Sequence, residues 1–212
     1  MKKNAAVLWT GGKDCALAFF KAQQEEYSIT HLVTFAPENP DFKAHNLSLI
    51  KQQVTSVGIP HIILTVKSPM QNSYEDAISL LKTKYHIETL ITGDIDEIEN
   101  HDNWIEKCSQ KSEMKVYNPL WKKNRTELLS TLLDHKFEVI FSLVKKPFFN
   151  QKWVGKVIDS TIIEELKKLN IDICGENGEY HTMVINAPFF KSQINIGSYT
   201  VTENEHYSYL HK

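Results

Sequence analysis

A glycine turn near the start of the chain carries the residues with the clearest chemical potential. Thr10-Gly11-Gly12-Lys13-Asp14-Cys15 stands between an apolar run and a segment of helical periodicity. Two adjacent glycines let the backbone turn sharply and expose consecutive N–H groups, and the N-terminal end of a following helix adds partial positive charge. With the Thr10 hydroxyl and the Lys13 ammonium, the turn predicts a site for phosphate or pyrophosphate. It matches neither GxxxxGK[ST] nor GxGxxG, and it also fits a plain strand-to-helix connection with Asp14 near the helix N-terminus.

A second dense group of polar residues lies near the end of the chain. Cys174-Gly175-Glu176-Asn177-Gly178-Glu179-Tyr180-His181-Thr182 separates two apolar runs. Carboxylates, an imidazole and hydroxyl groups this close together can bind a metal ion or a substrate amine and can move protons. The alternative is a β-hairpin, because Asn177-Gly178 is a strong signal for a type I′ turn. Glu176 and Glu179 would then be solvated flanks of the turn.

The elements around the first turn predict an α/β fold. Strands are expected at residues 5–9, 29–35, 61–66, 88–92 and 115–117, and helices at 14–24, 43–57, 73–85 and 103–109. Strands that alternate with helices indicate a Rossmann-like parallel sheet with helices on both faces. Ligands of such sheets bind beyond the carboxyl ends of the strands. Both the glycine turn and Gly93-Asp94 fall at such ends.

The pattern changes near residue 125 and predicts a smaller α+β subdomain. Helices are expected at 125–135 and 159–169, and mostly antiparallel strands at 137–144, 171–174, 181–185 and 194–201. We therefore expect two domains, residues 1–124 and 125–212, of which the second carries GENGEYHT.

The composition excludes several classes of protein. Lys and Arg number 24 against 26 Asp and Glu, for a formal net charge of −2, so a nucleic-acid partner is a poor fit. Cys15, Cys108 and Cys174 are widely spaced and predict neither a zinc site nor disulfides, as is usual in a cytoplasmic protein. The apolar run at 5–9 is too short for a signal peptide or a membrane span, so no membrane partner is expected.

Both motifs resemble those of one enzyme family. Residues 10–15 resemble the PP-loop, SGGKDS, of the N-type ATP pyrophosphatases, a group within the adenine nucleotide alpha hydrolase superfamily. Thr10 keeps the hydroxyl of the first serine, whereas Cys15 in place of the last serine loses a good donor to phosphate. Residues 174–182 resemble the GExGEYHT motif of the diphthine–ammonia ligase family, and the resemblance runs in order from about residue 7 to residue 190. A lysine-rich chain with Arg125 as its only arginine indicates a bacterial relative.

The resemblance implies an ATP-dependent amide ligase with an ATP-binding domain of the HUP type. ATP adenylates a carboxylate, pyrophosphate leaves, and ammonia attacks the acyl-adenylate. The residues implied to hold ATP are Thr10, Gly11, Gly12, Lys13, Asp14, Cys15, Gly93, Asp94 and, beside the adenine, Phe35. Asp14 and Asp94 are the implied ligands of Mg²⁺. The implied catalytic residues are Glu176, Glu179 and His181, and the implied substrate contacts are Tyr180 and Thr182.

Either Glu179 or His181 is expected to accept a proton from the attacking ammonia. This assignment predicts that Glu179→Ala abolishes turnover while ATP still binds.

Two other uses of the same ATP site remain open from the sequence. One is thiolation of a tRNA base, although thiolases of this superfamily commonly carry paired cysteines or a nucleic-acid-binding domain. The other is a regulatory module that binds nucleotide without productive turnover, which the Cys15 substitution favours. Diphthine, the carboxylate that this family is named for, is part of a modification found on archaeal and eukaryotic elongation factors. A bacterial chain is therefore expected to amidate a small metabolite or another protein. An apolar surface on the C-terminal subdomain is compatible with a homodimer.

Overall fold

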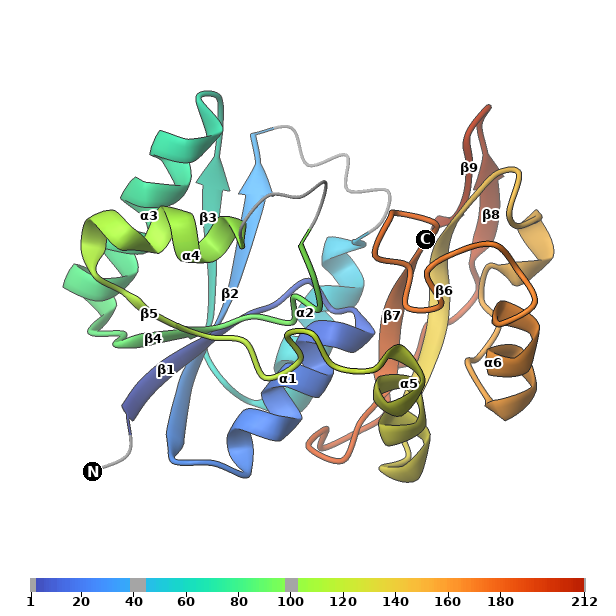
Figure 1. Cartoon of the computed structure of the whole chain (residues 1–212), viewed down its shortest axis with the longest axis horizontal. Coiled ribbons are helices and arrows are strands. Elements are labelled where there is room, and N and C mark those ends of the chain that lie inside the picture. Colours follow the sequence, from blue (N-terminus) through green and yellow to red (C-terminus); the bar gives the residue numbers. More distant parts are fainter. Residues whose placement is uncertain (1–2, 39–44, 98–102, 212) are drawn as a thin grey trace. The chain divides into compact units, whose positions relative to one another are not determined.

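The computed structural model describes residues 3–38, 45–97 and 103–211. The chain divides into two compact units (Figure 1). Unit 1 comprises Met1–Thr10, Asp14–Asp41 and Ile59–Lys122, and unit 2 comprises Gly11–Lys13, Phe42–Gly58 and Lys123–Lys212. The middle of the glycine turn therefore belongs with the C-terminal half of the chain, although its sequence neighbours belong to unit 1.

Unit 1 is built on a five-stranded parallel sheet. The strands β1 (Lys3–Leu8), β2 (Tyr27–Pro37), β3 (His61–Val66), β4 (Thr89–Ile91) and β5 (Lys115–Tyr117) lie in the order β3-β2-β1-β4-β5. All five are confirmed as predicted from the sequence. The order reverses between β1 and β4, and in open α/β sheets ligands bind outside the carboxyl ends of the strands at such a switch point.

Helices cover both faces of this sheet. α3 (Met70–Tyr85) and α4 (Trp104–Ser109), which runs on into the short η1 (Gln110–Ser112), share one apolar cluster with Ala6 and Val33. Because side chains alternate along a strand, Ala5 and Val7 are buried on the opposite face. Among the described residues, α1 (Lys13–Gln23) contributes none to the apolar cluster, and its Phe19 is completely buried and packs edge-on against Trp9.

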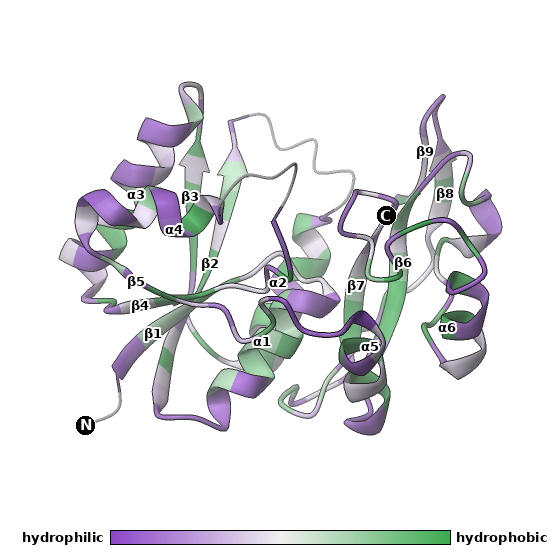
Figure 2. Cartoon of the chain, viewed as in Figure 1, coloured by the Kyte–Doolittle hydropathy of each residue, from purple (hydrophilic) through white to green (hydrophobic). Residues whose placement is uncertain are grey.

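Unit 2 is built on a four-stranded antiparallel sheet in the order β7-β6-β9-β8. The strands are β6 (Glu138–Lys145), β7 (Tyr180–Asn186), β8 (Thr200–Glu203) and β9 (Tyr207–His211). Figure 2 shows β6 as strongly hydrophobic, as expected of a central strand that is buried along almost its whole length. The helices are α2 (Leu47–Val57), α5 (Arg125–Asp134), α6 (Ser160–Leu166) and the short η2 (Gln151–Trp153).

The ends of α2 follow from its sequence. The Asn46 side chain accepts hydrogen bonds from the first turn, and Gly58 ends the helix in a left-handed conformation with φ 74°, the conformation in which glycine commonly ends helices. The helix was expected to begin at residue 43, which lies outside the described residues.

The expected strands of the C-terminal part are wrong at three places. Residues 171–174 form turns, residues 194–199 are irregular before β8, and β9 was not predicted. The first error has a clear cause, because the N–H groups of Asp172 and Cys174 bond to carboxylate oxygens instead of a ladder. The hairpin alternative is also wrong, since Gly178 but not Asn177 has the positive φ that a type I′ turn requires of both residues.

Candidate functional site

In unit 1, the exits of β1 and β4 lie side by side. Val7 pairs with Ile91 near the carboxyl ends of these strands. Beyond β4, Gly93 packs on the first turn of α1 so closely that an added Cβ would lie 2.5 Å from the carbonyl carbon of Asp14 and 2.6 Å from the amide nitrogen of Cys15. Only glycine permits this approach, which brings the backbones that carry Asp14 and Asp94 into direct contact.

The carboxylate of Asp94 is held by a buried amide. Asn103 donates from Nδ2 to Oδ2 of Asp94 at 2.7 Å, and its Oδ1 accepts the N–H of Glu106 at 3.0 Å as the N-cap of α4. Asn103 thus ties the orientation of Asp94 to the start of a helix. Sequence reasoning missed this role, although an asparagine directly before a helical segment is a capping signal.

Asp14 and Asp94 suit Mg²⁺ that is shared with substrate phosphates better than a metal ion bound by protein ligands alone. No cluster of three or more His, Cys, Asp or Glu residues suited to a metal occurs among the described residues. Mg²⁺ keeps several water ligands and is commonly bound by one or two carboxylates together with substrate phosphates. Two half-buried carboxylates at the switch point match that requirement.

The other expected nucleotide contacts of unit 1 flank the same edge of the sheet. Thr10 is exposed, and its hydroxyl donates to the sulfur of the buried Cys15 at 3.7 Å. Phe35, near the carboxyl end of β2, packs against Tyr74 with ring centroids 4.8 Å apart, and Tyr74 contacts Trp104. Burial raises the pKa of Tyr74, so its hydroxyl stays protonated. Neither Tyr74 nor Trp104 was predicted from the sequence to lie beside a nucleotide.

In unit 2, the glycine turn is clamped by two elements. The Gly11 carbonyl accepts the side-chain amide of Gln53 on α2 and the N–H of Val184 on β7, each at 2.9 Å. The N–H of Lys13 donates to the Thr182 hydroxyl at 3.0 Å. Gln53 is completely buried, and a Cβ on Gly11 would lie 2.5 Å from its Oε1. Gln53 was missed by sequence reasoning, although a polar residue on the buried side of an amphipathic helix is a signal.

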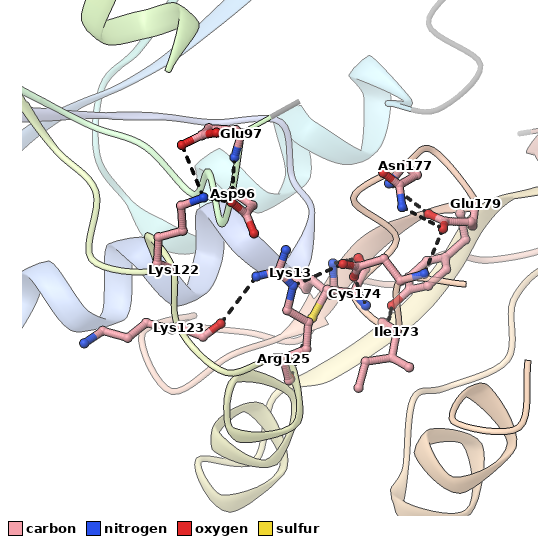
Figure 3. A network of polar contacts seen from close by, with 12 residues as sticks. Lys13, Asp96, Glu97, Lys122, Lys123, Arg125, Ile173, Cys174, Asn177 and Glu179 are labelled. Carbon is pink, nitrogen blue, oxygen red and sulfur yellow. Dashed lines mark hydrogen bonds and ion pairs between the residues drawn. The ribbon is translucent and has the colours of Figure 1, made fainter. Parts of the chain in front are cut away.

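The ammonium of Lys13 is turned toward the second motif. The side chain is only 3% exposed, and Nζ donates to the Cys174 carbonyl at 2.5 Å (Figure 3). The same Nζ lies 5.4 Å from the centroid of the Tyr180 ring. Tyr180 is itself fixed, because its hydroxyl donates to the carbonyl of Ile173 at 2.6 Å.

Glu179 holds the loop that precedes it in the chain by hydrogen bonds. Its carboxylate accepts the N–H of Asp172 at 2.8 Å, the N–H of Asn177 at 2.9 Å and the side-chain amide of Asn177 at 3.3 Å (Figure 3). The side chain is 4% exposed, so these donors stabilise a buried carboxylate. Glu176 lies half-buried in the same loop.

His181 follows on β7 and is neutral at physiological pH. Burial, and to a lesser extent the positive charge of Lys13, lower the pKa of its imidazole from 6.5 to about 4. The ring lies edge-on to that of His45, with centroids 5.3 Å apart.

The structure thus sorts the expected residues into two groups. Gly11, Gly12, Lys13, Glu176, Glu179, Tyr180, His181 and Thr182 belong to unit 2, and Thr10, Asp14, Cys15, Phe35, Gly93 and Asp94 to unit 1. Across the described ranges, no helix combines the length and apolar character needed to cross a membrane.

Comparison with known proteins identifies relatives for both halves of the chain. Residues 2–116 match the family model of the diphthamide synthase N-terminal domain, and residues 124–211 match that of the C-terminal domain. The "Diphthine--ammonia ligase" of Rattus norvegicus is 22% identical over 90% of this chain and 82% of its own. The Homo sapiens protein of that name is 26% identical over 61% of this chain and 49% of its own.

A solved structure titled as a predicted subunit of tRNA methyltransferase from Methanocaldococcus jannaschii is 18% identical over 91% of this chain and 100% of that chain. Its TM-score is 0.47, a likeness too weak to bear on function.

Proposed function

The chain belongs to the diphthamide synthase family, and from this premise we propose that it is an ATP-dependent amide ligase. A carboxylate attacks the α-phosphorus of ATP to give an acyl-adenylate and pyrophosphate. Ammonia then attacks the acyl carbon, and the products are an amide, AMP and a proton.

The observation that carries this proposal is the hydrogen bonding between the two motifs. Lys13 is bound through its backbone N–H to Thr182 and through its ammonium to the carbonyl of Cys174. A turn suited to pyrophosphate is therefore held against a segment rich in proton-transfer groups. A ligase that forms and then consumes an acyl-adenylate requires both functions at one centre.

Within this proposal, the phosphates are held by the turn that comprises Thr10, Gly11, Gly12, Lys13, Asp14 and Cys15. Asp14 and Asp94 are the proposed ligands of Mg²⁺, and Phe35 with Tyr74 the proposed border of the adenine. Mg²⁺ supplies neutralisation of charge on the phosphates when it is bound. The support for these ligands is the close packing of Gly93 on α1 and the hold of Asn103 on Asp94.

His181 is the better of the two proposed proton acceptors. The pKa of its imidazole, about 4, keeps the ring neutral from about pH 5 upward, so one ring nitrogen carries a lone pair, although a group of this pKa is a weak base. The carboxylate of Glu179 instead accepts three hydrogen bonds from within its own loop. Glu176, Tyr180 and Thr182 are proposed to frame the acyl group.

The acceptor carboxylate is proposed to belong to a small metabolite or a protein. We also propose a cytoplasmic location and a homodimer, on the cysteine usage and apolar surface noted in the sequence.

The test is phosphorus NMR of ATP incubated with Mg²⁺, ¹⁵N-ammonium and fractions of a cell extract as the source of acceptor. We expect AMP and pyrophosphate in equal amounts and ¹⁵N in an amide of the acceptor. Asp94→Asn should slow AMP formation by at least about tenfold, since it halves the carboxylate charge offered to Mg²⁺. The matched control is Asp96→Asn, the same change two residues later at a partly exposed ion pair with Lys122, shown in Figure 3.

Release of ADP and phosphate would contradict the proposal, because the bond between the α and β phosphates would not be the one cleaved. Tight ATP binding with no turnover in any fraction would favour the regulatory module.

A further inference from the structure

The Lys13 ammonium is bound by a backbone carbonyl of the second motif. A buried ammonium needs hydrogen-bond acceptors, and the carbonyl of Cys174 accepts one of its three N–H groups at 2.5 Å. Since this acceptor belongs to a turn and not to a strand, its place is set by whatever holds the turn.

Asp172 holds that turn. Its Oδ1 accepts the N–H of Cys174 at 2.7 Å, and its own N–H donates to Glu179 at 2.8 Å. The carbonyl of Asp172 also accepts the N–H of Gly175 at 2.9 Å. The peptide groups on both sides of Cys174 are therefore tied to Asp172.

Arg125 fixes the other oxygen of the same carboxylate. Its Nε donates to Oδ2 of Asp172 at 3.1 Å, and the two side chains are 22% and 16% exposed. The backbone carbonyl of Arg125 lies 3.7 Å from Sγ of Cys174, which donates to it. The only arginine of the chain, at the start of α5, thus contacts the turn at two points (Figure 3).

We infer that Asp172, oriented by Arg125, is a positioning residue that sets where the Lys13 ammonium lies, by presenting the carbonyl of Cys174 to it. The inference rests on the proposed function in that Lys13 belongs to the phosphate-binding turn. It gives the ion pair of Arg125 and Asp172, in the C-terminal half of the chain, a role in the binding of ATP phosphates.

The first measurement follows the Lys13 ammonium in the absence of nucleotide. A buried, hydrogen-bonded ammonium exchanges its protons slowly and gives a ¹⁵Nζ signal, which Lys13→Met identifies by its loss. In Asp172→Asn, the new side-chain amide must present N–H groups either to Arg125 or to the N–H of Cys174, so the turn loses an acceptor. We expect exchange at Lys13 to quicken by about tenfold, the scale set by loss of one hydrogen bond to a charged group.

The matched control is Asp159→Asn. Asp159 is in the same unit and also accepts a backbone N–H, that of Ile162 at 2.8 Å, but at the start of α6. It should leave the Lys13 signal unchanged. Arg125→Lys keeps the charge but replaces the planar guanidinium by a single ammonium nitrogen, and should give an intermediate exchange rate at Lys13.

The second measurement is the affinity for α,β-methylene-ATP with Mg²⁺ by calorimetry. Asp172→Asn should bind about tenfold more weakly than the wild type. The double variant with Lys13→Met should bind no more weakly than Lys13→Met alone, because both changes act through one ammonium. A role limited to stability would make the two losses additive.

An unchanged Lys13 signal in Asp172→Asn, or fully additive losses of affinity, would overturn the inference. If the wild-type protein did not bind the nucleotide while Asp172→Asn still freed the ammonium, the proposed function would fail and the positioning role would stand.

Discussion

Replacing Gly93 by alanine tests whether the exit of β4 packs on α1 as closely as the structure indicates. The added Cβ would meet three backbone atoms of Asp14 and Cys15 between 2.5 and 2.7 Å. Ordinary contacts between such atoms lie near 3.5–4.0 Å. Because the obstacles are backbone atoms, no side-chain rotation relieves the overlap, and the strand exit and helix must separate by about an ångström.

The expected cost is at the upper end of the range for overpacked sites, about 3 kcal/mol. For a chain of this size that corresponds to a fall in Tm of roughly 6–12 °C. The separation also moves Asp94 away from Asp14, so we expect nucleotide binding in the presence of Mg²⁺ to weaken by at least about tenfold.

The assay combines thermal unfolding with calorimetry of a non-hydrolysable ATP analogue. Gly197→Ala serves as the control, since Gly197 has φ 57° with no atom within 4 Å of an added Cβ. The free energy of unfolding of Gly197→Ala should fall by about 1–2 kcal/mol, because alanine is strained in the left-handed conformation. Its affinity for the ATP analogue should be unchanged. A Gly93→Ala protein that melts with the wild type, or that binds the analogue equally well, would refute the close approach.

Three further predictions follow from the site. Since the folded pKa of His181 is about 4 against an ordinary 6.5, its contribution to stability is complete above about pH 6.5 and is lost as the pH falls toward 4. In urea unfolding, this group should lower the free energy of unfolding of the wild type by about 2 kcal/mol at pH 5 relative to pH 7. His181→Asn should lack this part of the pH dependence. Gln53→Leu should destabilise the fold by about 2 kcal/mol in the same assay, because it leaves the Gly11 carbonyl short of a donor; an unchanged midpoint would contradict this. Asn103→Ala should cost about 1 kcal/mol as a lost cap and should also raise the Mg²⁺ concentration needed for nucleotide binding, whereas a pure capping role would leave that concentration unchanged.

The parallel sheet of unit 1 was predictable because its signals are local. The apolar run that begins at residue 5 forms a strand buried on both faces, whereas the run at 61–66 forms the edge strand β3, in which Ile62 and Val66 are buried and Ile63 is exposed. Glycine at 58 ends a helix because it readily takes the left-handed conformation, wherever that helix packs. The C-terminal strands were less predictable. The segment at 171–174 is apolar enough for a strand, but the carboxylates of Asp172 and Glu179 capture its N–H groups.

The sequence by itself determined the parallel sheet of unit 1, the two motifs and the family, since each depends on residue types at short spacings. Only the tertiary structure decided which groups surround those motifs. Lys13 contacts Cys174 across 161 positions of sequence, and Gln53 contacts Val184 across 131. Such partners are chosen by how the chain packs, so no local pattern indicates them. The same holds for His181, whose ordinary pKa is set by its residue type and whose lowered value is set by burial and by Lys13.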